Sequence, residues 1–193
     1  PCDVVVGPGN RWVTAAKQLV AGQVGIDMLA GPSELVVLAD ASADPNLIAA
    51  DLLAQAEHDP DALPVLISVE ARLIDQVESA LNAQLEDLVT AEVSRAALEG
   101  GFAIAAASLE EATALCDRLA PEHLQVMTEN PERDARQLNH YGALFLGSSS
   151  AEVFADYGMG PNHTLPTGGS ARYRGGLSIL DFLRVRTWMA LDS

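Results

Sequence analysis

The sequence predicts an α/β fold, in which a parallel sheet is covered by helices in an incomplete Rossmann-like arrangement. Short apolar runs rich in β-branched residues alternate with helical patterns along the 193 residues. These runs are nearly continuous, which is typical of strands covered by helices on both faces. Apolar residues make up 49% of the chain and charged residues 20%, so a sizeable core can form and general disorder is excluded.

Strands and helices are expected in regular alternation. The strands are predicted at residues 2–7, 34–40, 64–69, 102–107, 123–127 and 143–147. Helices are predicted near residues 10–21, 45–58, 70–88, 91–99, 109–119, 131–140 and 150–157. Asp44 before Pro45 offers an N-cap and a proline at the first helical position. Ser108 and Glu111 form a capping-box pattern, and the pair Gly100-Gly101 predicts a helix end.

Three regions are expected along the chain. Residues 1–33 predict the C-terminal end of a Rossmann-like domain, and residues 34–176 a second Rossmann-like α/β domain that carries the functional residues. Residues 177–193 predict the start of a C-terminal helical tail, because an apolar helical pattern develops in FLRVRTWMALDS. The chain opens on Pro1 inside an apolar run, so we expect it to be a segment of a longer polypeptide.

Charge and cysteine content exclude several classes of partner. The chain has 11 basic and 27 acidic residues, a formal charge of −16, which repels nucleic-acid phosphates. No apolar run reaches the roughly 20 residues needed to span a bilayer. The two cysteines, Cys2 and Cys116, have no zinc-binding or redox spacing, so we expect reduced thiols in a cytoplasmic protein.

A glycine turn near the start could approach an anionic cofactor. VVVGPGNRW at 4–12 predicts a strand, a Gly-x-Gly turn and a helix whose first N–H groups could face an anion. Trp12 stands where the dinucleotide fingerprint has its third glycine. Either a tight structural turn or a cofactor contact fits this pattern.

Metal ligands are suggested by two separate segments. Gln55 and His58, at helical spacing i and i+3, share a face and could hold one metal ion. Asp156, before a glycine-rich loop that contains His163, could add a third oxygen ligand. The alternatives are a surface or capping histidine and a carboxylate at a helix end.

Proton-transfer chemistry is suggested by Glu122 and His123. They follow Pro121 at a helix-to-strand junction, which we take as the open end where α/β sheets gather ligands. Histidine moves protons near neutral pH, and a neighbouring carboxylate can activate water. Adjacent residues in an extended segment point to opposite sides, so both serve one site only if the junction is bent. No serine elbow, P-loop or CxxC motif is present, which excludes acyl hydrolases, NTPases and thiol redox enzymes.

Five motifs in order resemble the second half of histidinol dehydrogenase. They are GPGN at 7–10, IDMLAGPSE at 26–34, DLLAQAEHDP at 51–60, APEHLQ at 120–125 and DYGMGPNHTLPT at 156–167. The resemblance implies that Gln55, His58 and Asp156 are three of four ligands of a catalytic Zn²⁺. The fourth would be a histidine in the C-terminal tail of the partner subunit of a homodimer.

The same resemblance implies the other site residues. Asn10 matches a contact to NAD, and Glu122 and His123 match the catalytic pair. The substrate, L-histidinol, would be bound by Ser33, Gln55, His58, His123 and Asp156.

The chemistry implied is the last step of histidine biosynthesis, the oxidation of L-histidinol through the aldehyde to L-histidine with two NAD reduced. His123 would act as the general base in the first oxidation, and Glu122 would activate water for the second. One alternative is a related zinc- and NAD-dependent dehydrogenase that oxidises another small polar alcohol, such as a sulfonated diol. Another is a domain without activity of its own, and we expect the isolated chain to reduce no NAD with histidinol.

Overall fold

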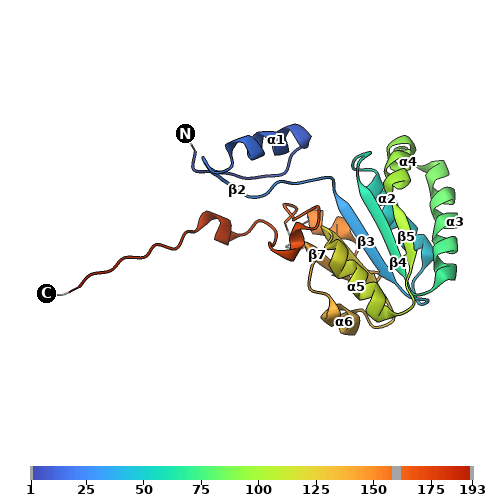
Figure 1. Ribbon diagram of the computed structural model, residues 1–193. Helices are drawn as coiled ribbons and strands as arrows, with labels where there is room; N and C mark the ends of the chain where they lie inside the picture. Colours follow the sequence, from blue (N-terminus) through green and yellow to red (C-terminus); the bar gives the residue numbers. More distant parts are fainter. Residues whose placement is uncertain (1, 158–161, 192–193) are drawn as a thin grey trace.

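A five-stranded parallel sheet forms the body of the protein in the computed structural model (Figure 1). The structure describes residues 2–157 and 162–191, and their side chains other than those of residues 155–157. The strand order is β5-β4-β3-β6-β7, and every pairing is parallel. The strands are β3 (Glu34–Ala39), β4 (Leu63–Ser68), β5 (Phe102–Ala105), β6 (His123–Met127) and β7 (Ala143–Leu146). The predicted α/β class with a parallel, helix-covered sheet is confirmed.

Helices cover both faces of this sheet. They are α2 (Pro45–Ala56), α3 (Ala71–Asp87), α4 (Ala91–Gly100), α5 (Leu109–Leu119) and the short α6 (Pro131–Asp134). The predicted caps form, since the Asp44 side chain accepts from the Asn46 N–H and the Ser108 hydroxyl from the Glu111 N–H. These caps start α2 after β3 and α5 after β5, so both helices run back antiparallel to the sheet.

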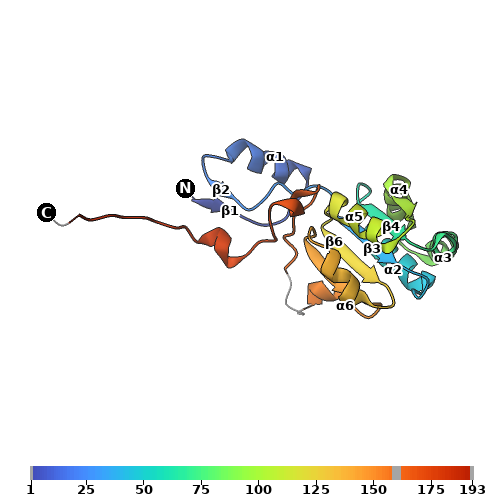
Figure 2. The same ribbon diagram turned by 60° about the horizontal axis from the view of Figure 1, so that its bottom comes forward.

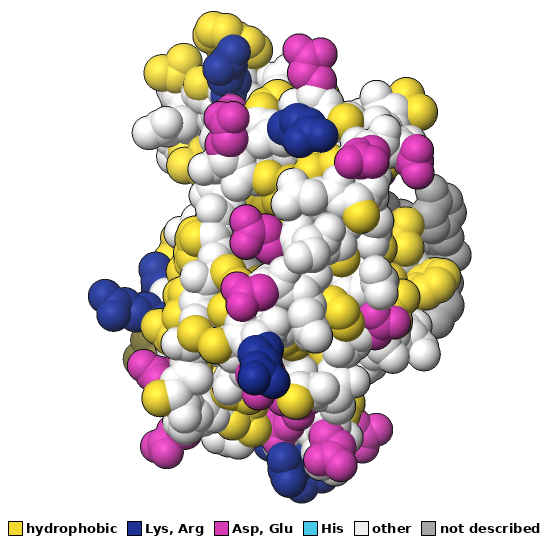
Figure 3. Space-filling model, turned by 90° about the vertical axis from the view of Figure 1, so that its right-hand side faces the viewer, with side chains coloured by type: hydrophobic (Ala, Val, Ile, Leu, Met, Phe, Trp, Pro, Cys, Tyr) yellow, Lys and Arg dark blue, Asp and Glu magenta, His cyan; other side chains and the backbone are white. Residues whose placement is uncertain are grey.

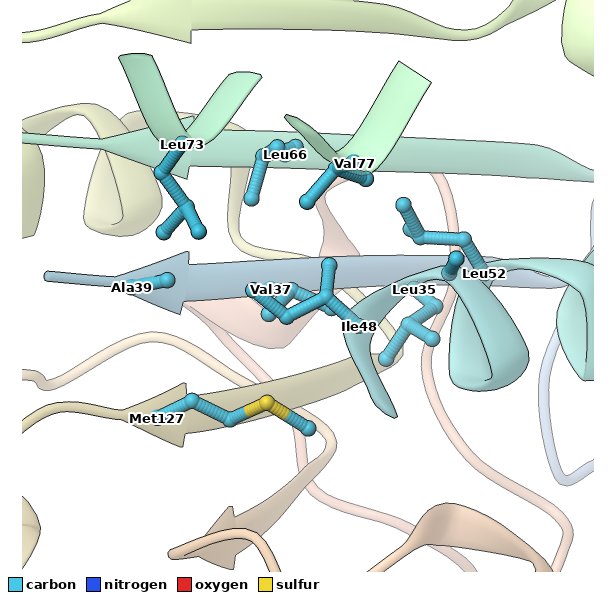
Figure 4. Packing of buried hydrophobic residues seen from close by; sticks show 10 residues of the cluster. Leu35, Val37, Ala39, Ile48, Leu52, Leu66, Leu73, Val77 and Met127 are labelled. Carbon is cyan, nitrogen blue, oxygen red and sulfur yellow. The ribbon is translucent and has the colours of Figure 1, made fainter. Parts of the chain in front are cut away.

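Two apolar clusters hold the helices on the sheet. Leu35, Val37 and Ala39 of β3 point to one face and pack against α2 and α3 (Figure 4). Val36 and Leu38 point to the other face, in the cluster that contains Cys116 of α5. Because successive side chains of β3 point to opposite faces of the sheet, this one strand contributes to the core on both sides.

The first 33 residues form a small unit beside the amino ends of the sheet strands (Figures 1 and 2). The parallel pair β1 (Val4–Val5) and β2 (Gly25–Ile26) is joined by α1 (Arg11–Val20). Strand β2 is not among the predicted strands, and β1 is shorter than the predicted strand at 2–7. A buried ion pair between Lys17 and Asp27 fixes α1 against β2.

The later predicted helices differ from the structure. The helix expected at 131–140 is α6 followed by a 3-10 turn at Ala135–Gln137, and the one expected at 150–157 is a 3-10 helix at Glu152–Tyr157. The predicted helical tail is not observed: a 3-10 turn at Ile179–Phe182 is followed by a segment without helix to residue 191, which runs away from the body (Figures 1 and 2). Its apolar side chains are exposed, and an isolated helix this short is marginal without a surface to pack on.

One face of the molecule carries dispersed charge (Figure 3). On the face over α3 and α4, acidic and basic side chains lie among apolar and polar ones and form no single-sign patch (Figure 3). None of the helices within the described residues combines the length and apolar character needed to cross a bilayer.

Candidate active site

A pocket of about 1040 Å³ opens at the amino ends of β3, β4 and β6. Its wall includes five predicted site residues and two others: Asn10, Ser33, His58, Glu122, His123, Glu152 and His163. We expected Glu122 and His123 to lie at the edge of the sheet where α/β proteins usually bind ligands. That expectation is wrong, because this edge is the one beyond the carboxyl ends of the strands. His123 is the first residue of β6, and the site therefore lies at the opposite, amino edge.

The junction before β6 is bent, which brings Glu122 and His123 into one pocket. Ala120 takes a left-handed conformation (φ 51°) after α5, and its N–H donates to the carbonyl of Cys116. This turn ends the helix and places Glu122 just before the regular strand. Glu122 Oε2 then lies 3.8 Å from His123 Nδ1. The alternative in which the two side chains point to opposite sides does not apply here.

Glu122 is buried and is paired with a second carboxylate, Glu34. The backbone N–H of Glu34 donates to Glu122 Oε2 at 3.2 Å, and the N–H of Glu122 donates to Glu34 Oε2 at 3.3 Å. Burial raises the pKa of Glu122 to about 7, and the negative Glu34 adds to this rise. Hydrogen bonds from the Glu34 N–H and from Ser33 oppose the rise. Glu122 can thus exchange a proton near neutral pH.

Three neighbouring residues, Glu34, Glu152 and Phe145, orient the ring of His123. Its Nδ1 lies 3.2 Å from the carbonyl oxygen of Glu34 and 3.4 Å from Glu152 Oε1. Its ring packs near that of Phe145, with the centroids 6.1 Å apart. Because a carbonyl only accepts hydrogen bonds, the contact with Glu34 indicates a hydrogen on Nδ1.

Gln55 and His58 lie in and just after the last turn of α2. His58 is exposed in the pocket wall. Gln55 is fully buried, and neither atom of its amide has a hydrogen-bond partner among the described residues. A buried amide without a partner is costly, and a cation bound to its oxygen would relieve that cost. The donor set of one amide oxygen and one imidazole therefore fits a metal ion such as zinc.

The third predicted ligand, Asp156, has a side chain that lies outside those described. Among the side chains that the structure does describe, no three His, Cys, Asp or Glu residues converge into a metal site. The proposed ligand set thus rests on Gln55 and His58 here.

Asn10 caps α1 at the pocket rim. Its Oδ1 accepts from the N–H groups of Trp12 and Val13, at 3.0 and 3.2 Å. The local role of Asn10 is therefore to begin the helix, and its place in the wall also leaves it facing the pocket.

The glycine-rich loop is tied to the pocket by two backbone contacts. Thr167 Oγ1 accepts from the Gly31 N–H at 2.6 Å, and Glu34 Oε1 accepts from the Gly168 N–H at 2.8 Å. His163, in the same loop, lines the pocket. The sequence did not predict that Glu34 and Glu152 contact the site residues, although Glu34 stands beside Ser33 in the GPSE motif.

The fold and the site define an α/β protein with a buried carboxylate and a buried imidazole 3.8 Å apart in the wall of one pocket. The model of the histidinol dehydrogenase family matches residues 1–193. The chain belongs to the histidinol dehydrogenase family, a family of oxidoreductases, and the resemblance found in its motifs is confirmed.

Relatives and a solved structure agree with this assignment. The chain is 52% identical over 183 residues to the histidinol dehydrogenase of Thermus thermophilus, covering 95% of this chain and 44% of the relative. It is 50% identical over 190 residues to that of Zymomonas mobilis, covering 98% and 44%. The crystal structure of histidinol dehydrogenase from Elizabethkingia anophelis superposes with a TM-score of 0.90 at 41% identity, covering 93% of this chain and 42% of that one. The chain thus spans less than half the length of the relatives it matches.

Proposed function

We propose that the protein to which this chain contributes oxidises L-histidinol through the aldehyde to L-histidine, the last step of histidine biosynthesis. The observation that carries the proposal is the Glu122–His123 pair, which is buried in the wall of the 1040 Å³ pocket. Each of the two oxidations releases a proton, and the second also consumes water, so two proton-accepting groups suit this reaction.

His123 is proposed as the base of the first oxidation. The Glu34 carbonyl accepts from Nδ1, so in the neutral imidazole Nε2 would be the atom that takes the proton of the substrate hydroxyl. The packing of the ring near Phe145 restricts its rotation. The imidazole is thus oriented before the substrate binds.

Glu122 is proposed as the base of the second oxidation. A carboxylate with a pKa of about 7 is a far better proton acceptor than an ordinary glutamate, while still being ionised in much of the protein near neutral pH. It takes a proton from the water that adds to the aldehyde carbon. Ser33, which lines the same wall, would contact the substrate.

The proposed cofactors are Zn²⁺ and NAD. Gln55, His58 and Asp156 would hold the metal together with a histidine of the partner subunit in a homodimer, and Asn10 would contact NAD. When bound, zinc would fix the amine and imidazole of histidinol, and two NAD molecules would accept the two hydrides. The Gln55 amide, which has no hydrogen-bond partner among the described residues, supports the metal part of this proposal. We place the protein in the cytoplasm, where NAD and histidinol meet.

The test is the yield of NADH per L-histidinol with the full-length protein, with and without a chelator. Two NADH per substrate, lost on chelation and restored by zinc, are expected. If zinc is bound and no NADH forms, the substrate assignment is wrong, and other small polar alcohols such as sulfonated diols become the candidates.

A further inference from the structure

We propose that Glu34 is a positioning residue, whose carboxylate holds Glu122 in the orientation needed to activate water. The inference rests on the proposed function, because it concerns the second oxidation of that reaction. Glu34 begins β3 and Glu122 precedes β6, so two adjacent strands bring together residues 88 positions apart.

The two glutamates hold each other by reciprocal hydrogen bonds. Each carboxylate accepts from the backbone N–H of the other residue, at 3.2 and 3.3 Å. Rotation of the Glu34 side chain would release the Glu122 N–H, and rotation of the Glu122 side chain would release the Glu34 N–H. The Glu34 carboxylate therefore fixes the backbone from which the Glu122 side chain extends, and the Glu34 N–H holds Glu122 Oε2, which lies 3.8 Å from His123 Nδ1.

The chemistry of Glu34 requires both of its carboxylate oxygens. Oε2 accepts from the Glu122 N–H, and Oε1 accepts from the Gly168 N–H at 2.8 Å. A glutamine at this position could satisfy only one of these donors, because its NH₂ group would face the other N–H. The carboxylate thus joins the residue before β6 to the glycine-rich loop.

Side chain and backbone of Glu34 act on different members of the catalytic pair. The carboxylate contacts the Glu122 backbone, whereas the carbonyl oxygen contacts His123 Nδ1 at 3.2 Å. A change confined to the Glu34 side chain leaves that carbonyl in place. Such a change should therefore affect the water-consuming step and spare the step assigned to His123.

The experiment compares four full-length proteins: wild type, Glu34→Gln, Glu122→Gln and the double variant. NADH formation is measured once from L-histidinol, limited to the first oxidation by trapping the aldehyde, and once from the supplied aldehyde. Glu34→Gln should slow aldehyde oxidation about tenfold and alcohol oxidation by less than about twofold. In the Glu122→Gln background it should change aldehyde oxidation by less than about twofold, because residues that act as a unit are not additive.

A matched control is Glu70→Gln. Glu70 also accepts a backbone hydrogen bond, from Arg72 N–H at 3.1 Å, but it lies beyond the carboxyl end of β4, away from the pocket. It should change neither step. Glu34→Asp keeps the charge and withdraws both oxygens by one carbon, so it serves as a second variant if the glutamine variant does not fold, with the same selective loss expected.

The proposal would be overturned if Glu34→Gln or Glu34→Asp slowed both steps equally. It would also be overturned if, in the double variant, the rate of aldehyde oxidation fell by the product of the two single-variant effects. A second measurement is independent of activity: hydrogen exchange of the Glu122 amide, read on peptides spanning 121–125, should be faster in the Glu34 variants. Unchanged exchange would also overturn it. A wild-type protein that oxidises neither compound counts against the proposed function, whereas the exchange result still decides the role of Glu34.

Discussion

Lys17 and Asp27 form a buried ion pair in which the Nζ–Oδ1 distance is 2.6 Å and the side chains are 6% and 0% exposed. Lys17 is the only lysine of the chain. Its ammonium also donates to the carbonyl oxygen of Gly7, and Asp27 Oδ2 accepts from the Gly7 N–H at 2.7 Å. The pair therefore fixes the glycine turn that leads to Asn10 and the pocket.

Replacing Lys17 should destabilise this first unit strongly. Lys17→Met would leave the Asp27 charge buried without its partner, and the loss of one member of a buried pair costs about 3–5 kcal/mol. Thermal and denaturant unfolding of the full-length protein measure the effect. Arg95→Met, at an exposed position of α4, is the matched control and should stay within about 0.5 kcal/mol of wild type. A Lys17→Met protein as stable as the control would show that the pair does not support the turn.

Replacing His58 should remove zinc and activity together. His58→Ala deletes the nitrogen ligand of the proposed site, so NADH formation should fall at least about 100-fold. Metal content by elemental analysis and NADH formation are measured on the same preparation. His140→Ala is the control, because the His140 ring lies against the backbone of Asp117, outside the pocket wall. Stoichiometric zinc in His58→Ala would refute the ligand assignment.

Replacing Glu122 should separate the two oxidations. Glu122→Gln should slow aldehyde oxidation by about 10²–10⁴-fold, with a smaller effect on alcohol oxidation, since only the aldehyde step consumes water. In the wild type, the base is active when deprotonated, so aldehyde oxidation should rise with pH through about 7 and then level off. The variant should lose this inflection. If both steps slow equally, Glu122 has a structural role only.

A methyl group at Gly142 should disturb the catalytic pair. A Cβ built there lies 2.5 Å from the carbonyl oxygen of Glu122 and 3.1 Å from Cδ of Pro166. Gly142→Ala should therefore displace the start of β6, costing about 1–3 kcal/mol of stability and lowering the rate of both oxidations. At Gly100, the last residue of α4, a Cβ meets nothing within 4 Å, and Gly100→Ala should be neutral or slightly stabilising. Equal stability of the two variants would contradict the steric argument.

The strands of the main sheet could be predicted because their apolar runs are continuous. Residues 34–40 and 123–127 carry that pattern and correspond closely to β3 and β6. Strand β2 has only Gly25 and Ile26, which is too short to leave a periodic signal. The tail pattern from Phe182 onward predicted a helix that has no surface to pack against in this chain.

The site was predicted in part. The motifs point to Glu122, His123 and His58, and the structure brings all three into one pocket wall. The contacts of Glu34 depend on the pairing of Leu35 with His123 across two strands, which no local pattern contains. The prediction of which edge of the sheet holds the site was wrong. Ligands of α/β sheets usually bind beyond the carboxyl ends of the strands, whereas Glu122 and His123 lie at the amino end of β6.

The position of the pocket at the amino edge has an electrostatic consequence. In a parallel sheet every connecting helix returns to this edge, so α2 ends beside His58 and α5 ends just before Glu122. A helix carries roughly half a negative charge at its carboxyl end. Both carboxyl ends lie within three residues of the pocket wall, and they favour positive charge near it, whether on a metal ion, on the ammonium of an amino alcohol, or on His123 after it accepts a proton.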